Sequence, residues 1–282
     1  MDYVKPVEVM KNLLALGEAK AALSAKDLLL RSILAGAMLA CATSFAVTAA
    51  AQTHVPLVGA LVFPVCFVMI MLLGLDLVTG NFAAVMLAGV DGRCSWPRVF
   101  SNLLWVFVGN LVGSVLYGAL LYAVLTMGGS EAPAGIAAQI VAIAEAKTTA
   151  YAAHGSAGMA TVVVKGILCN WMVCLGLVMG LTSRSTLGKI VAIWLPIVTF
   201  FAQGFEHSVV NMFVIPSGMM LGAKVSLSDW WLWNQIPVTL GNLIGGFVFT
   251  GLFLYWTYNP SKKKVEMEAA APVPADEGLA EA

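Results

Sequence analysis

A short segment, Gly204–Phe213, places an acid, an imidazole and an amide inside a stretch of sequence that is otherwise apolar. Glu206 and His207 are adjacent, and Asn211 follows about one helical turn later. Ionisable side chains are costly in lipid, so a group of this kind within a membrane segment indicates a functional site. An imidazole at such a place can carry a proton or form a hydrogen bond to a small anion.

A second segment, Gly74–Phe82, has the same spacing. Gly74 is followed by an acid two residues on, Asp76, and by an amide seven residues on, Asn81, and all three lie 130 positions before their counterparts. Further matches in register are the Gly-Asn motifs Gly109–Gly113 and Gly241–Gly245, offset by 132, and the glycines Gly36 and Gly166, offset by 130. The sequence therefore predicts an internal repeat.

The composition is that of a membrane protein with several spans. Of 282 residues, 60% are hydrophobic and 11% are charged, and the mean hydropathy is +0.89. Soluble domains carry about 25% charged residues, so a globular soluble protein is excluded. No signal peptide precedes the first apolar run. The five cysteines lack CxxC or histidine spacing, so neither a metal nor a cofactor is predicted.

We expect an all-α protein with three parts. Residues 1–27 form a cytoplasmic amphipathic segment on the membrane surface, 28–258 a channel domain of six spans, and 259–282 a disordered tail. The second and fifth spans are broken at the two polar segments, and Gly128–Gly158 is expected to be a loop or re-entrant. The other predicted spans are Leu28–Ala51, Val99–Met127, Met159–Leu181 and Gln235–Tyr258.

The distribution of positive charge predicts the orientation. Twelve of the 15 Lys and Arg residues lie in the terminal segments and the second and fourth connections. By the positive-inside rule, both termini are then cytoplasmic. Each repeat holds three spans, so the second copy enters the membrane from the opposite side, which predicts an inverted repeat with the two broken spans facing each other.

The breaks suggest a small polar constriction. An exposed helix N-terminus favours an anion, and Thr79 and His207 would add a hydroxyl and an imidazole. We expect Asp76 and Glu206 to accept the freed backbone N–H groups and hold the breaks, with proton carriage as the alternative. For His207 we favour a functional role over a structural hydrogen bond to a carbonyl.

Four segments resemble signature sequences of the formate/nitrite transporter family. They are Leu77-Val78-Thr79, Gly166–Cys174 (GILCNWMVC), Gly204–Phe213 (GFEHSVVNMF) and Ile236–Asn242 (IPVTLGN). The resemblance covers about Lys5–Tyr258 and implies an aquaporin-like bundle, assembled as a homopentamer in the inner membrane with one pore in each protomer.

The resemblance also implies roles for individual residues. His207 would be the pore centre with Thr79 facing it, and Glu206, Asn170, Asp76 and Asn211 would be supporting residues. The cytoplasmic constriction would comprise Leu77 and Val78 with Phe67 nearby, and the periplasmic one Phe63, Phe200 and Val173. Val78 replaces a bulkier aromatic residue of related channels, so the cytoplasmic constriction is expected to be looser. Lys147 would attract the anion, with Lys165 as the alternative.

The predicted function is transport of a small monovalent weak-acid anion, formate first, with His207 in a proton relay. Nitrite, bicarbonate, hydrosulfide and lactate are alternatives, because the constriction requires only a small monovalent anion of a weak acid. A neutral-solute channel of the aquaporin kind is a further alternative, although neither break carries Asn-Pro-Ala. No nucleophile-base pair or cofactor motif suggests an enzyme, and no nucleic-acid partner is expected.

Overall fold

The chain is built from helices throughout residues 2–259, the part that this computed structural model describes. Within that range no β-strand forms, and one isolated bridge joins Tyr3 to Ser183. Four helical segments are long and apolar enough to cross a membrane: α2 (Ala25–Thr53), α6 (Trp96–Leu125), α9 (Gly155–Gly180) and the final run Leu227–Tyr258. The protein is thus an all-helical membrane protein, as predicted.

Shorter apolar helices lie between these long ones and come in pairs. In the first pair, one member is the run Pro56–Leu72, made of α3 (Pro56–Val62) and α4 (Pro64–Leu72), and the other is α5 (Val78–Val90). In the second, α10 (Thr186–Ala202) precedes α11 (Ser208–Met220). We call residues 73–77 the first break and residues 203–207 the second break.

The second residue of each break is a glycine in the left-handed region. Gly74 has a φ of +65° and Gly204 a φ of +63°, a conformation that glycine adopts without steric cost. The Leu75 N–H donates to the Ile70 carbonyl at 3.0 Å, which closes the end of α4 as in a Schellman motif. At the end of α10 the Phe205 N–H donates to the Phe200 carbonyl at 3.3 Å in the same way. The helices therefore stop where the sequence predicts the interruptions.

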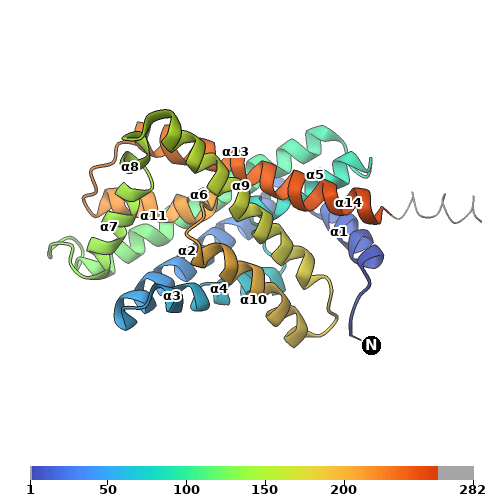
Figure 1. Ribbon diagram of the computed structural model, residues 1–282, viewed down its shortest axis with the longest axis horizontal. Coiled ribbons are helices and arrows are strands. Elements are labelled where there is room, and N and C mark those ends of the chain that lie inside the picture. The colour runs from blue at the N-terminus through green and yellow to red at the C-terminus, as the bar shows by residue number, and fades with distance from the viewer. Residues whose placement is uncertain (1, 260–282) are drawn as a thin grey trace, which may run out of the picture.

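The N-terminal helix α1 (Pro6–Ala21) belongs to the bundle. Its apolar face, which the sequence assigned to the membrane surface, packs against α5 instead. At Gly17 a Cβ atom would lie 1.9 Å from the Ala84 carbonyl oxygen, so only glycine permits this approach. α1 also lies beside α14 (Phe253–Tyr258), so the two ends of the described chain are on the same side of the molecule (Figure 1).

The segment between α6 and α9 is more ordered than a loop. It contains α7 (Ile136–Ala146) and α8 (Thr149–Ala152), and α7 packs against α11. The final run also begins earlier than Gln235. It consists of α12 (Leu227–Trp230), η1 (Trp231–Gln235), α13 (Ile236–Ile244), η2 (Gly245–Leu252) and α14, with η1 and η2 in π-helical geometry. The predicted tail, apart from Asn259, lies outside the described residues.

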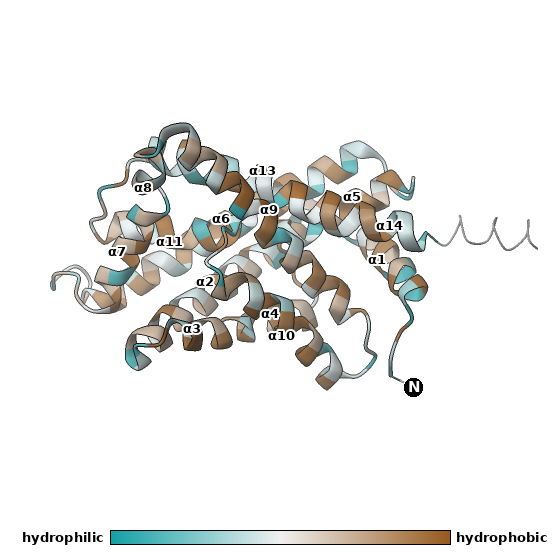
Figure 2. Cartoon of the chain, viewed as in Figure 1, coloured by the Kyte–Doolittle hydropathy of each residue, from teal (hydrophilic) through white to brown (hydrophobic). Residues whose placement is uncertain are grey.

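Small residues allow the long helices to approach closely. A Cβ on Gly36 of α2 would lie 2.3 Å from the Asn110 carbonyl oxygen of α6. A Cβ on Gly245 would lie 2.2 Å from the Ile167 carbonyl oxygen of α9. Such contacts are typical of membrane helices, where close van der Waals packing drives association. Large hydrophobic side chains are also exposed on the outside of the bundle, for example Leu104 and Leu120 on α6. Hydrophobic residues recur along most of the helices (Figure 2).

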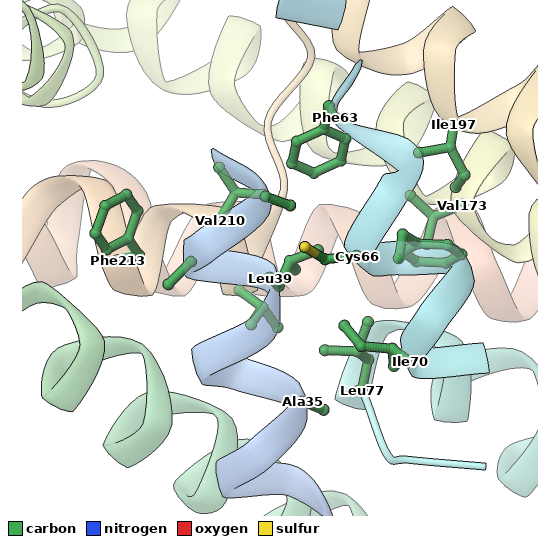
Figure 3. Packing of buried hydrophobic residues seen from close by; sticks show 14 of the residues in the cluster. Ala35, Leu39, Phe63, Cys66, Ile70, Leu77, Val173, Ile197, Val210 and Phe213 are labelled. Carbon is green, nitrogen blue, oxygen red and sulfur yellow. The ribbon is translucent and has the colours of Figure 1, made fainter. Parts of the chain in front are cut away.

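The largest hydrophobic cluster surrounds the two breaks. Figure 3 shows Ile70 beside Leu77, whereas Phe63 lies farther from both and nearer to Val210 of α11, and Val173 of α9 belongs to the same cluster. All five are buried. All six residues predicted at the constrictions belong to this cluster: Phe63, Phe67, Leu77, Val78, Val173 and Phe200.

Candidate functional site

The first break contains a buried ion pair. The Lys20 ammonium lies 2.5 Å from Oδ1 of Asp76, whose side chain has no exposed surface. The Asn81 amide donates to the same oxygen at 3.2 Å. Oδ2 of Asp76 has no hydrogen-bond partner among the described residues. Lys20 is the next-to-last residue of α1, so docking of this helix delivers the counter-charge.

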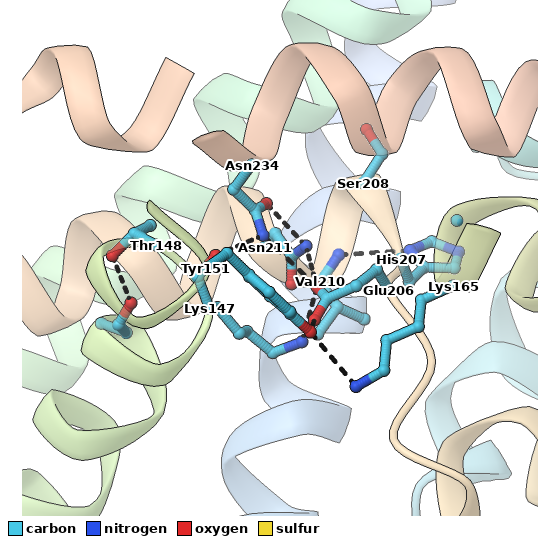
Figure 4. A network of polar contacts seen from close by, with 12 residues as sticks. Lys147, Thr148, Tyr151, Lys165, Glu206, His207, Ser208, Val210, Asn211 and Asn234 are labelled. Carbon is cyan, nitrogen blue, oxygen red and sulfur yellow. Dashed lines mark hydrogen bonds and ion pairs between the residues drawn. The ribbon is translucent and has the colours of Figure 1, made fainter. Parts of the chain in front are cut away.

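The second break contains a richer version of this arrangement (Figure 4). The Lys147 ammonium lies 2.8 Å from Oε2 of Glu206. The Asn211 amide donates to the same oxygen at 2.8 Å, and the Tyr151 hydroxyl donates to Oε1 at 3.0 Å. Lys165 donates to the Tyr151 hydroxyl at 3.2 Å. Of the two candidate lysines, Lys147 binds the carboxylate directly and Lys165 reaches it through Tyr151.

Asparagines, and not the carboxylates, accept the freed backbone N–H groups. Oδ1 of Asn110 accepts from the Val78 N–H at 2.9 Å, and Oδ1 of Asn242 accepts from the Ser208 N–H at 2.8 Å. Each amide also donates to the carbonyl of the acid at its break, Asp76 or Glu206. The prediction that the two acids accept these N–H groups is therefore wrong, because their side chains are engaged by lysine and amide donors.

A second pair of asparagines extends each network. Asn81 donates to Asn102, which donates to the Lys20 carbonyl. Asn211 donates to Asn234, which donates to the Lys147 carbonyl. Each lysine is thus held by both its side chain and its backbone. The lysine, acid and asparagine hydrogen bonds thus recur at both breaks, and the second break adds bonds from Tyr151 and Asn234 to Glu206.

His207 is the N-cap residue of α11. Its Nδ1 accepts a hydrogen bond from the Val210 N–H at 3.2 Å, and its Nε2 is buried with no partner among the described residues. A ring that accepts at Nδ1 carries its proton at Nε2 when neutral. The ring stacks on Phe200 with a centroid distance of 5.8 Å. His207 therefore holds an unused N–H donor in the middle of the bundle.

Thr79 is fixed through its backbone. Its carbonyl accepts from the Asn170 amide at 3.0 Å and from the Cys174 thiol at 3.2 Å. Its Oγ1 is buried and has no partner among the described residues. Asn170 was expected to support His207, but in the described structure its amide instead joins Thr79 to the Asn242 carbonyl.

A cavity of about 130 Å³, the Lys147 vestibule, leads to the imidazole. Its lining includes Lys147, Phe200, His207 and Val210. The Phe63 ring stacks on Phe201 and meets Phe200 edge-on, at centroid distances of 4.0 and 5.8 Å. The aromatic residues therefore narrow this space beside His207.

On the side of the first break lie two further cavities. The larger, of about 170 Å³, contains Lys20 and Lys189 in a lining that is otherwise apolar or glycine, and we call it the Lys20 vestibule. The smaller, of about 20 Å³, shares Lys20 with it and adds Phe67, Leu77 and Asn81. A cavity of that size holds about one water molecule. Phe67 thus lies on the same side as Leu77.

Sequence reasoning missed several members of these networks. Lys20, Asn102, Asn234 and Tyr151 were not among the predicted site residues. The repeat carried a signal for three of them, because Lys20 and Lys147 are offset by 127 positions and Asn102 and Asn234 by 132. Tyr151 has no such signal. Within residues 2–259, no group of three metal-binding side chains comes together.

Comparisons with known proteins place the chain among transporters. The family model for the formate/nitrite transporters matches residues 7–256. A probable formate transporter of Methanothermobacter thermautotrophicus is 34% identical, covering 91% of this chain and 98% of that protein. The formate channel FocA of Escherichia coli K12 is 31% identical, covering 80% of this chain and 84% of that protein.

Two solved structures have a similar fold. An "FNT family ion channel" aligns with a TM-score of 0.77 and 31% identity, over 90% of this chain and 99% of that one. A "pentameric formate channel with formate bound" aligns with a TM-score of 0.68 and 26% identity, over 83% of this chain and 97% of that one.

Proposed function

Because this chain belongs to the formate/nitrite transporter family, we propose that it conducts formate, a small monovalent anion of a weak acid, through a pore between the two breaks. The related proteins named for formate support this choice of substrate. Each protomer would have its own pore, and a homopentamer is the proposed assembly, by analogy with the pentameric relative.

The proposed architecture has six spans arranged as an inverted repeat. The four long helical segments would be whole spans, and each pair of short helices would form one broken span. The matched hydrogen bonds at the two breaks support the repeat. The charge distribution supports cytoplasmic termini, and in that orientation the Lys20 vestibule would open to the cytoplasm and the Lys147 vestibule to the periplasm.

The unused Nε2–H of His207 carries the proposal. A buried donor without a partner is costly unless something polar reaches it, and a carboxylate in the pore would do so. A neutral imidazole can bind the anion without the strong attraction of a full positive charge, so it can also release it. The Thr79 hydroxyl would offer a second hydrogen bond nearby.

The proposed passage starts at Lys147. Its ammonium attracts the anion into the vestibule, while Glu206 keeps the lysine in place. The anion then passes the Phe63 and Phe200 rings, meets His207 and Thr79, and leaves past Leu77. On this second side Val78 and Phe67 form the remaining apolar contacts, and Lys20 receives the anion. Val173 completes the apolar wall around the imidazole.

Proton coupling would require His207 to gain and lose a proton in each transport cycle. The neutral ring in this geometry donates a hydrogen bond through its Nε2–H, but a neutral imidazole is too weak an acid to release that proton. To act as a relay, Nδ1 must first gain a proton, which requires the bond from the Val210 N–H to break. A relay would therefore open the first turn of α11 in every cycle, whereas simple anion conduction leaves it closed.

Anion flux from proteoliposomes across a pH series tests the proposed function. We expect formate to exceed nitrite, bicarbonate, hydrosulfide and lactate. Formate flux accompanied by stoichiometric proton movement supports the relay, and a His207→Ala variant with unaltered pH dependence excludes it. If water or glycerol gradients drive swelling while none of these anions moves, the protein is a neutral-solute channel and the proposal is wrong.

A further inference from the structure

The Lys20 vestibule contains two cations and no acid in its lining. Lys20 and Lys189 are its only charged residues, and the remaining wall consists of leucine, isoleucine, methionine and glycine. Apolar walls screen a charge poorly, so the potential of an unpaired cation extends across the cavity. The role of the vestibule depends on which of the two charges is unpaired.

Lys20 is already committed to Asp76. Its ammonium lies 2.5 Å from Oδ1 of that buried carboxylate. Lys189 is different, because the described part of the chain gives its ammonium no hydrogen bond and no ion pair. Its side chain is partly exposed and lines the vestibule. The unpaired positive charge is therefore on Lys189.

Two acids lie at this end of α10, and other groups bind both of them. Asp2 accepts hydrogen bonds from the Ser183 and Ser185 hydroxyls and from the Arg184 and Ser185 N–H groups. Glu8 pairs with the Arg184 guanidinium at 2.8 Å. Neither carboxylate forms an ion pair with Lys189, although Asp2, whose partners are neutral groups, keeps its own charge.

The position of Lys189 in its helix also argues against a structural role. It lies in the first turn of α10, after the N-cap Ser185. A positive charge there opposes the helix dipole, which favours acids at the N-terminus and bases at the C-terminus. The lysine does not stabilise its own helix.

The cavities define an order for the two lysines. The smaller cavity, next to Leu77, shares Lys20 with the vestibule but does not include Lys189. An anion entering from this side therefore meets Lys189 first, Lys20 second and the Leu77 constriction third. In this order the anion first binds Lys189, whose charge is unpaired, and then moves to Lys20, whose charge is balanced by Asp76.

We infer that Lys189 captures a small monovalent carboxylate or oxyanion at the mouth of the Lys20 vestibule, by one charge-assisted hydrogen bond. The inference rests on the proposed function and adds to it a binding step on the cytoplasmic side. Lys189 acts on binding and entry, and not on the imidazole at the pore centre.

Single-channel recording in planar bilayers with formate as the permeant anion tests the capture step. At low ionic strength we expect Lys189→Gln to lower the conductance by about five- to tenfold, since charge focusing changes on-rates by about 10- to 1000-fold. The loss should disappear near about 1 M salt, where the Debye length is about 3 Å. Lys189→Arg should retain most of the conductance. Lys11→Gln, on the exposed face of α1, is the matched control.

A chemical variant tests the charge in protein that is already folded. Lys189→Cys, treated from one compartment with aminoethyl methanethiosulfonate, regains a positive charge and should regain conductance. The negatively charged sulfonatoethyl reagent should lower the conductance further. Treated wild-type protein gives the baseline for the five native cysteines.

The outcomes separate this inference from the proposed function. Wild-type protein without formate current contradicts the proposed function, and the inference is overturned with it. Wild-type current with Lys189→Gln equal to Lys11→Gln at every salt concentration overturns the inference alone. Equal responses of Lys189→Cys to the two reagents also overturn it.

Discussion

The two breaks share one framework and differ at the residue that faces the centre. At both, an acid pairs with a lysine, and one asparagine receives the freed backbone N–H. Two more asparagines connect the acid to the backbone carbonyl of the lysine. At the position just before the new helix, the first break has Leu77 and the second has His207. The framework thus holds the broken backbone, and the proposed chemistry depends on this single position.

The breaks also differ in how many groups stabilise the acid. Asp76 has two partners, Lys20 and Asn81, and its Oδ2 has none in the described chain. Glu206 accepts from four side chains, which are Lys147, Tyr151, Asn211 and Asn234. The charge at the first break therefore depends more heavily on one lysine.

Removing that lysine should have the largest effect. Lys20→Met leaves the Asp76 carboxylate buried and nearly unpaired, and we expect a loss of about 3–5 kcal/mol in the free energy of unfolding. Lys147→Met should cost less by about 1.5 kcal/mol, because hydrogen bonds from neutral donors still reach Glu206. Thermal unfolding in detergent measures both, with Lys11→Met as control. Equal losses at the two breaks would contradict the difference.

Removing the matched asparagines should have smaller and nearly equal effects. Asn110→Ala and Asn242→Ala each leave one backbone N–H, at Val78 or Ser208, without an acceptor. An unsatisfied buried group costs about 1–3 kcal/mol. Asn12→Ala, at an exposed position of α1, should change the unfolding midpoint little. A loss at only one of the two breaks would show that the shared hydrogen bonds are not equivalent in energy.

Exchanging the central residue should have the smallest effect on stability and a large one on transport. His207→Leu removes a helix cap, which costs about 1 kcal/mol, and also removes the Nε2–H donor. His207→Asn keeps a capping oxygen, so its stability should stay near that of the wild type. We expect formate flux in proteoliposomes to fall about tenfold or more in both variants, as for loss of a charge-assisted hydrogen bond. Unchanged flux in His207→Asn would remove the imidazole from the proposed pathway.

The sequence was informative where a residue type is forced by the backbone. Gly74 and Gly204 mark the breaks because their φ values favour glycine, and the apolar runs mark the long helices. The sequence was less informative about partners. Lys20 lies 56 positions from Asp76, and nothing local distinguishes it from the other lysines of the N-terminal segment. Its pairing depends on how α1 packs against α5.

The sequence also did not show which groups the buried asparagine side chains bind. An asparagine next to a glycine in an apolar helix is compatible with simple packing, and only the three-dimensional arrangement shows which carbonyl and N–H groups Asn110 joins. The same applies to Asn170, which lies in a recognisable motif but contacts the Thr79 backbone. Tertiary hydrogen bonds of this kind leave no periodic pattern in a sequence.

The separation of the two polar networks has a consequence for biosynthesis. The lysine, acid and asparagine contacts at the first break involve residues between Lys20 and Asn110, and those at the second involve residues between Lys147 and Asn242. Chains emerge from the ribosome at about 5–20 residues per second, N-terminal part first. The first half can therefore neutralise its buried acid while the second is still being made. The Thr79 carbonyl, held by Asn170 and Cys174, is then a point where the finished halves join.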